Sequence, residues 1–146
     1  MSSANTYFPA IPTSVKSVVN KKRISKYYTD RSRQIGRCTI RTSGATCSIS
    51  KGKTATRTIQ TTYGLSRYSV ASSLGISSAK SVTTQAACTS PKMKKGKSWV
   101  GWAQGSRYRY KIQSKTRVAG FTIFGNKSGW LYAFNPNPAY ITCGLG

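Results

Sequence analysis

Apolar and basic side chains alternate most regularly over residues 106–112. In an extended chain the members of this set would lie on two opposite sides, with Tyr108, Tyr110 and Ile112 on one and Arg107, Arg109 and Lys111 on the other. A period of two residues is typical of a strand with one buried and one solvated side. The segment therefore predicts a half-buried β-strand with a row of three cations on its open side.

Weaker strand patterns occur along the rest of the chain, separated by turns rich in Gly, Lys or Pro. The strand candidates are residues 54–59, 80–88, 98–104, 116–124, 129–134 and 139–143, and the breaks fall at 51–53, 91–97, 125–127, Pro136 and Pro138. This spacing predicts an all-β fold, an antiparallel β-sandwich or barrel. One short helix is expected at residues 67–74, ended by Gly75 in the left-handed conformation.

The cysteines form an even set of four, Cys38, Cys47, Cys88 and Cys143. None stands in a paired metal-ligand spacing and the chain has no His, so two disulfides are favoured over a metal site, and no cofactor is expected. A Ser-Gly turn between two strand-like pieces predicts a hairpin closed by Cys38–Cys47. Cys88 and Cys143 then pair at strand ends. Two disulfides indicate an oxidising compartment, so the sequence predicts a secreted protein.

The composition of the chain changes near the first cysteine. Residues 1–20 are polar and contain two prolines, and residues 21–41 carry a run of cations. We therefore expect a basic polar arm over residues 1–37 and a disulfide-stapled β domain over residues 38–146. The basic run suits either a solvated flank or a specific contact with a polyanion.

Charge changes the picture more than any motif. The chain holds 24 Lys and Arg, a single acid (Asp30) and no His, which gives a net charge of +23 over 146 residues. Such a surface cannot neutralise itself, so the expected partner is an anionic membrane surface, a cell-wall polymer or nucleic acid. An acidic immunity or carrier protein is a further class of partner. The candidate polyanion-binding residues are Lys21, Lys22, Arg23, Lys92, Lys94, Lys95, Lys97, Arg107, Arg109 and Lys111.

Aromatic residues lie among these cations. Trp99 and Trp102 precede the alternating segment, and together with Trp130 they are candidate anchors at an interface. Tryptophan and tyrosine can stack on bases or lie at the headgroup boundary of a membrane. The simpler alternative places the aromatic residues in the core and leaves the cations facing water.

Residues 65–82 resemble a helix-turn-helix. Ala71 and Gly75 have the spacing with which that family packs its two helices, but the apolar residue expected six positions after the glycine is Ser81, with Val82 one position late. The resemblance implies a recognition helix over residues 77–85 and DNA binding. The competing interpretation is a single capped helix at 67–74 that connects two strands.

Catalytic groups are scarce in this composition. A serine triad needs a histidine and a glycosidase needs two carboxylates, so both classes are excluded by residue content. The protein is more simply a binding protein than an enzyme. One catalytic alternative stays open, a ribonuclease toxin that works without histidine and stabilises a phosphorane with Lys and Arg.

At the level of the whole chain, the strand texture and Gly-Lys turns over about residues 45–110 resemble small secreted β-rich proteins of Gram-positive bacteria, some of them bacteriocin-like or toxin-like. The resemblance implies a secreted antibacterial protein that binds the anionic bacterial envelope. It assigns a role to no individual residue.

Overall fold

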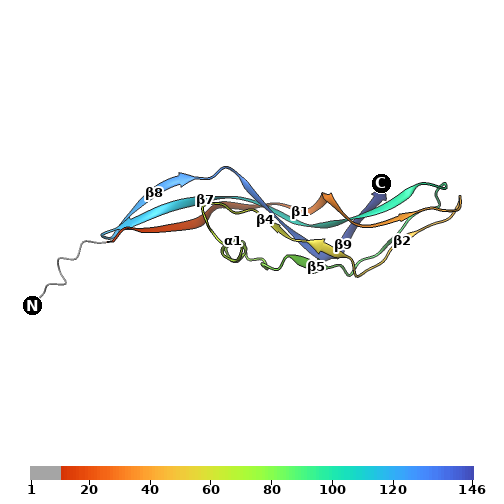
Figure 1. Cartoon of the computed structure of the whole chain (residues 1–146), viewed down its shortest axis with the longest axis horizontal. Helices are drawn as coiled ribbons and strands as arrows, with labels where there is room; N and C mark the ends of the chain where they lie inside the picture. The colour runs from red at the N-terminus through yellow and green to blue at the C-terminus, as the bar shows by residue number, and fades with distance from the viewer. Residues whose placement is uncertain (1–10) are drawn as a thin grey trace, which may run out of the picture.

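The computed structural model describes residues 11–146, and its secondary structure is almost entirely β. In chain order the elements are β1 (Thr13–Thr39), β2 (Ser48–Ile49), β3 (Thr54–Thr56), β4 (Thr58–Ile59), α1 (Arg67–Leu74), β5 (Ser81–Thr83), β6 (Cys88–Thr89), β7 (Ser98–Val118), β8 (Phe121–Lys127) and β9 (Leu131–Leu145). Three long strands, β1, β7 and β9, run along an elongated molecule (Figure 1). The predicted antiparallel all-β class is confirmed.

The main sheet is built around β7. Its strands follow the order β1-β7-β9-β4, and β8 pairs with the last part of β7, beyond the point where β9 begins. All of these pairings are antiparallel. In the described part of the chain this order is an open path from β1 to β4, rather than the closed ring of a barrel. The two-stranded sheets β2-β6 and β3-β5 complete the fold.

Helix α1 covers the middle of one side of the main sheet. Val70 of the helix packs with Tyr110, Ile112 and Ala133 in a cluster of fully buried side chains. The predicted helix is confirmed at both ends. Ser66 caps the first turn by accepting a hydrogen bond from the Ser69 amide, and Gly75 ends the helix with a positive φ of 72°. Gly75 is the helix terminator that the sequence predicted, and Ser66 follows the ordinary preference for serine at the N-cap.

Both predicted disulfides, Cys38–Cys47 and Cys88–Cys143, are present, and no cysteine among the described residues is free. The hairpin expected between Cys38 and Cys47 is wrong. Cys38 belongs to β1 and lies opposite Trp99 of β7, whereas the residues after Cys47 form β2 and pair with β6. The disulfide therefore joins two sheets instead of closing a local hairpin.

The second helix of the predicted helix-turn-helix is also wrong. Residues 81–83 form β5, which pairs with Thr54–Thr56 of β3. The Ser- and Thr-rich sequence favours this outcome because these residues are weak helix formers and suit strands and turns.

The predicted boundary at residue 38 does not separate two regions. β1 begins at Thr13 and pairs with β7 as far as Thr39, so the basic segment belongs to the main sheet. Residues 1–10 of the predicted arm lie outside the described residues.

β7 and β9 are each longer than the segments predicted for them. β7 continues through Gly105, and β9 continues through Pro136 and Pro138. A register shift between Ala103 and Gly105 brings Gly105 opposite Pro136. A Cβ at Gly105 would lie 2.1 Å from the Asn135 carbonyl oxygen, so only glycine allows this approach. Bulges of this kind admit proline into a strand because the local ladder is already interrupted.

Candidate polyanion-binding face

The alternation on β7 is realised as predicted. Tyr110 and Ile112 are fully buried against helix α1, and the basic residues between them point to the other side of the strand. This arrangement follows from the two-residue repeat of an extended chain. Arg107, Arg109 and Lys111 therefore stand in a row on the side that does not face α1.

Arg107 lies between two aromatic rings. Its guanidinium carbon is 4.5 Å from the ring centre of Tyr28 in β1 and 4.4 Å from that of Tyr132 in β9. Both distances are within the range of a cation–π contact. Neighbouring strands on both sides of β7 thus hold the guanidinium plane.

The next two cations share one ring. The guanidinium carbon of Arg109 lies 4.5 Å and Nζ of Lys111 4.7 Å from the ring centre of Trp130. Trp130 immediately precedes β9 and is 42% exposed. Arg109 Nε is buried and has no hydrogen-bond partner among the described residues. We call the set formed by Tyr28, Arg107, Arg109, Lys111, Trp130 and Tyr132 the cation–aromatic face.

The potential at this face is strongly positive. Lys22 of β1 is the register partner of Arg109, so one more cation stands beside the row. Like charges opposite each other in a sheet destabilise it. The rings can offset part of this repulsion, and an anionic ligand would offset more. All 24 cations and the single acid fall within residues 11–146, so undescribed residues 1–10 add no charged side chain.

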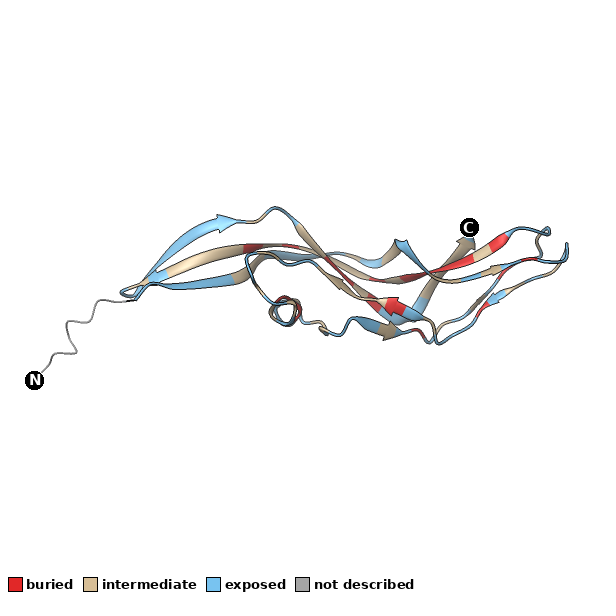
Figure 2. Cartoon of the chain, viewed as in Figure 1, coloured by how far each residue is buried: buried red, intermediate tan, exposed pale blue. Residues whose placement is uncertain are grey.

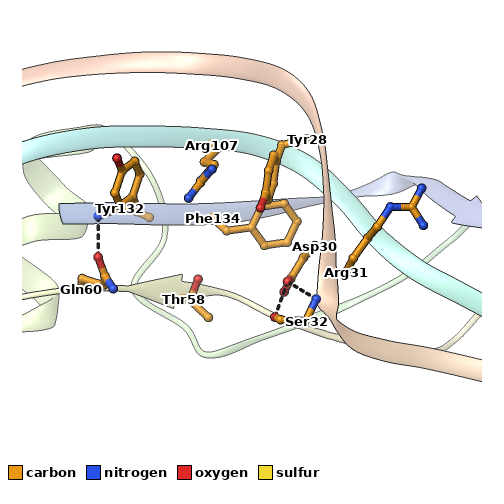
Figure 3. A pocket seen from close by; sticks show the side chains of 10 residues that line it. Tyr28, Asp30, Arg31, Ser32, Thr58, Gln60, Arg107, Tyr132 and Phe134 are labelled. Carbon is orange, nitrogen blue, oxygen red and sulfur yellow. Dashed lines mark hydrogen bonds between the residues drawn. The ribbon is translucent and has the colours of Figure 1, made fainter. Parts of the chain in front are cut away.

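A pocket of about 380 Å³ adjoins the face at Arg107 (Figure 3). Its lining residues are Tyr28, Asp30, Arg31, Ser32, Thr58, Gln60, Arg107, Tyr132, Ala133 and Phe134. Asp30 accepts hydrogen bonds from the Ser32 amide and hydroxyl, and Gln60 accepts one from the Tyr132 amide. The chain's one side-chain carboxylate thus accepts hydrogen bonds from a residue two positions further along β1, at the edge of the face.

Two other arginines show the contrasting arrangement. Arg57 donates to Asn135 Oδ1 and the Ala79 carbonyl, and Arg67 donates to the Ser78 and Arg57 carbonyls. Burial, followed by the nearby charge of Arg67, lowers the pKa of Arg57. These guanidiniums bind backbone oxygens and one side-chain amide oxygen, where other proteins would use carboxylates. They are structural.

The pKa of Tyr110 is strongly shifted. Burial raises its pKa to about 12, and its hydroxyl donates a hydrogen bond to the Gln60 carbonyl oxygen. A buried neutral phenol of this kind cannot serve as a base near neutral pH. No group of three His, Cys, Asp or Glu residues that could hold a metal ion occurs within residues 11–146.

The predicted basic residues fall into two regions rather than one. Of the three predicted cations in β1, Lys22 is opposite Arg109 and stands beside the cation–aromatic face, whereas Arg23 is opposite Tyr108 on the side that faces α1. Lys21 donates to the Ser73 carbonyl at the end of α1.

The second region lies at the disulfide-linked end. The residues concerned, Lys92, Lys94, Lys95 and Lys97, form the connection between β6 and β7. This connection packs against residues 40–45, through bonds such as Gly44 N–H to the Met93 carbonyl.

The three predicted tryptophan anchors also separate. Trp130 is exposed and belongs to the face. Trp102 is only 9% exposed and lies under Arg31, with 4.6 Å between the guanidinium carbon and the ring centre. Trp99 is half-buried. A ring covered in this way offers little area to a partner, so Trp130 is the anchor that the structure supports.

Sequence reasoning missed Tyr28 and Tyr132. Neither stands in the segment from 97 to 112, and both reach Arg107 only through strand pairing. Pairing between strands that are distant in the sequence leaves no local signal. The only related feature of the sequence is its high tyrosine content of nine residues.

Comparison with protein-family models, with curated proteins and with solved structures finds no match to this chain. Within residues 11–146, no helix has the length and apolar character needed to cross a membrane.

Proposed function

We propose that the protein is a secreted, antibacterial or toxin-like protein that binds anionic polymers or lipids of the bacterial envelope through its cation–aromatic face. One observation carries the proposal. Three successive outward cations of β7 are held on rings from β1, β9 and the segment before β9, in a chain with one acid. The two disulfides support an oxidising compartment, in agreement with secretion.

The proposed mechanism has two stages. The net charge of +23 draws the protein to a phosphate-rich surface and releases the counterions condensed there. The stacked guanidiniums then form charge-assisted hydrogen bonds with phosphate oxygens. Their planes are already fixed by the rings, so less side-chain freedom is lost on binding. Binding, rather than turnover, is the proposed activity.

The test compares two variants with the same loss of charge. Arg107, Arg109 and Lys111 are replaced by Gln in one, and Lys92, Lys94 and Lys95 by Gln in the other. Affinity for purified teichoic acid is measured by calorimetry between about 50 and 200 mM salt. The face variant should bind roughly tenfold more weakly than the control variant at the same salt, a difference of about 1.4 kcal/mol.

Equal losses in the two variants would mean that total charge, and not the face, determines binding. An affinity of the wild-type protein that does not change with salt would remove the electrostatic basis altogether. Growth inhibition and dye leakage from whole cells, measured on the same variants, test the antibacterial part of the proposal.

A nucleic-acid-binding protein is the second candidate, because the same cations and rings suit phosphates and bases. The helix-turn-helix that suggested DNA binding is not formed, since β5 occupies the position of the recognition helix. Tighter binding of RNA or DNA than of teichoic acid at equal salt would favour it. Metal-free cleavage of purified tRNA, lost on replacing Arg107 alone, would favour the histidine-free ribonuclease.

A further inference from the structure

The hairpin formed by the end of β7 and the start of β8 exposes large apolar side chains. Phe121 is 74% exposed, Ile123 60% and Phe124 64%. The hairpin forms one end of the elongated molecule, and β8 is exposed along its whole length (Figure 2). We call residues 115–124 the hairpin tip. The single strand predicted over residues 116–124 is wrong, because the chain turns back at Ala119 and Gly120 and β8 continues to Lys127.

The tip is a well-formed hairpin. Val118 pairs with Phe121, which leaves a loop of two residues, Ala119 and Gly120. Their φ values, 49° and 80°, are both positive, as a type I′ turn requires. The exposed side chains are therefore presented by paired strands.

Apolar side chains occupy both faces of the tip. Ile123 and Phe121 are opposite Thr116 and Val118, on the side of β7 that carries Tyr110 and Ile112. Helix α1 packs against that side near Tyr110 and Ile112. Phe124 lies on the other side, where Nζ of Lys115 is 5.4 Å from the centre of the Phe124 ring. A hairpin that is apolar on both faces suits insertion end-on into an apolar layer, since docking of one flat face would leave the other exposed.

Cations surround this apolar end. Lys115 and Arg117 lie on β7, Lys127 ends β8, and Lys16 of β1 is opposite Ser114. Aromatic and aliphatic side chains flanked by Lys and Arg are typical of segments that lie at the boundary between headgroups and acyl chains. Long basic side chains can keep their charge among the headgroups while their stems lie along apolar surface.

The charge also argues against a second copy as the occupant. Two copies brought together at their tips would each carry a net charge of +23, and each would have a single acid to offset the repulsion. Nucleic acid would satisfy the cations but would leave Ile123 and Phe121 without an apolar partner. An anionic bilayer satisfies both.

We propose that the hairpin tip inserts into the interface of an anionic phospholipid bilayer, with Phe121, Ile123 and Phe124 at the acyl boundary and Lys115 and Arg117 on lipid phosphates. This inference rests on the proposed function, because the cation–aromatic face supplies the attraction to an anionic surface. It adds a second site and names the lipid bilayer as the partner of that site.

The first experiment measures binding to vesicles of equal parts phosphatidylglycerol and phosphatidylcholine, and to pure phosphatidylcholine, by co-sedimentation. In the tip variant Phe121, Ile123 and Phe124 are all replaced by Thr, which keeps the strand propensity. The control variant is Tyr68→Ala, which removes a 72% exposed ring from helix α1. The tip variant should bind the anionic vesicles at least about 30-fold more weakly than wild type, and the control should match wild type.

A second experiment reports insertion directly. The emission of the Phe121→Trp variant is recorded with the same vesicles, with and without brominated acyl chains, and the wild-type emission is subtracted to isolate the added indole. Insertion predicts a shift of this difference emission to shorter wavelength and quenching by the brominated lipid. A difference emission that is neither shifted nor quenched would overturn the inference even if the protein sediments with the vesicles.

Teichoic acid binding, measured in parallel, separates the two proposals. The tip variant should bind the polymer as wild type does, with an unchanged near-ultraviolet circular dichroism spectrum. Wild-type protein that binds neither polymer nor vesicles would defeat the proposed function. Equal vesicle binding by wild type and tip variant would defeat the insertion alone. A wild-type dimer that the tip variant does not form would assign the tip to a second copy.

Discussion

Both ends of the molecule carry cations, but the cluster of large exposed apolar side chains lies at the hairpin tip. At the end with the Cys38–Cys47 disulfide, Ile40 and Ile49 are only 2% exposed beneath a surface rich in lysine. At the hairpin tip, Phe121 and Ile123 are mostly exposed. Because cations occur at both ends, the exposed apolar side chains are what assigns the proposed bilayer contact to the hairpin tip.

The same comparison identifies the interactions that oppose electrostatic repulsion in this cationic chain. The chain has one acid, so ion pairs between side chains cannot offset the repulsion. Disulfides oppose the repulsion at one end. Backbone carbonyls accept hydrogen bonds from Arg57 and Arg67 near helix α1, and aromatic rings hold Arg107 and Arg109 on the cation–aromatic face.

Removing the Cys88–Cys143 disulfide should have the largest effect. The bond closes 55 residues, and on the chain-entropy model its loss costs about 4 kcal/mol in the free energy of unfolding. The Cys38–Cys47 bond closes 9 residues and should contribute about 2.5 kcal/mol. Urea denaturation of the two double-Ala variants measures both values. The order would be contradicted if loss of the shorter loop proved the more damaging.

Two isoleucines on one side of the main sheet compare the covered and uncovered parts directly. Ile112 is fully buried against α1, so Ile112→Ala should destabilise the protein by about 2–5 kcal/mol through lost burial and a cavity. Ile123 is 60% exposed, and Ile123→Ala should change stability by less than about 0.5 kcal/mol.

Thermal unfolding of the two variants under one buffer condition gives the comparison. A large loss for Ile123→Ala would mean that the tip residue is packed in solution, and it would weaken the case for insertion into a bilayer.

The buried phenol predicts a loss of stability at high pH. Tyr110 has a pKa of about 12 in the folded chain against an ordinary value of 10, so the fold favours the neutral form. This contribution is fully present below pH 10, and roughly 2 kcal/mol of it is lost as the pH rises towards 12.

The control is Tyr110→Phe, which cannot ionise at this position but shares every other titration, including that of the lysines. The stability difference between wild type and Tyr110→Phe should therefore shrink or reverse above pH 10. A difference that stays constant from pH 8 to 12 would contradict the raised pKa.

The fold class could be read from the sequence because its signals are local. Alternation at residues 106–112 predicted which side of β7 is buried, and Ser66 and Gly75 mark the ends of the one helix. The helix-turn-helix resemblance failed because two matching positions, Ala71 and Gly75, also suit a single capped helix. The serine-rich segment after them has a low helix propensity, so it does not form a second helix.

What the sequence did not reveal depends on strand pairing. The row of cations was visible, but the rings of Tyr28 and Tyr132 reach Arg107 from strands far away in the chain. β7 and β9 run through Gly105 and Pro136 because a register shift brings these two residues opposite each other. Neither residue alone predicts continuation of a strand, since each is ordinarily read as a break.

A small gain in stability is expected from a substitution in the turn of the hairpin tip. Ala119 has a φ of 49°, a conformation that places its Cβ close to the backbone and costs roughly 1 kcal/mol relative to a residue that tolerates it. Asn followed by Gly is the preferred pair for a type I′ turn. Ala119→Asn should therefore stabilise the protein by about 0.5–1 kcal/mol, measured as a rise in the urea midpoint with an unchanged slope. The variant keeps Phe121, Ile123 and Phe124 in place, so it should bind anionic vesicles at least as well as wild type. A stabilised hairpin that no longer binds them would mean that the tip must open to engage the bilayer, which contradicts insertion as a preformed hairpin.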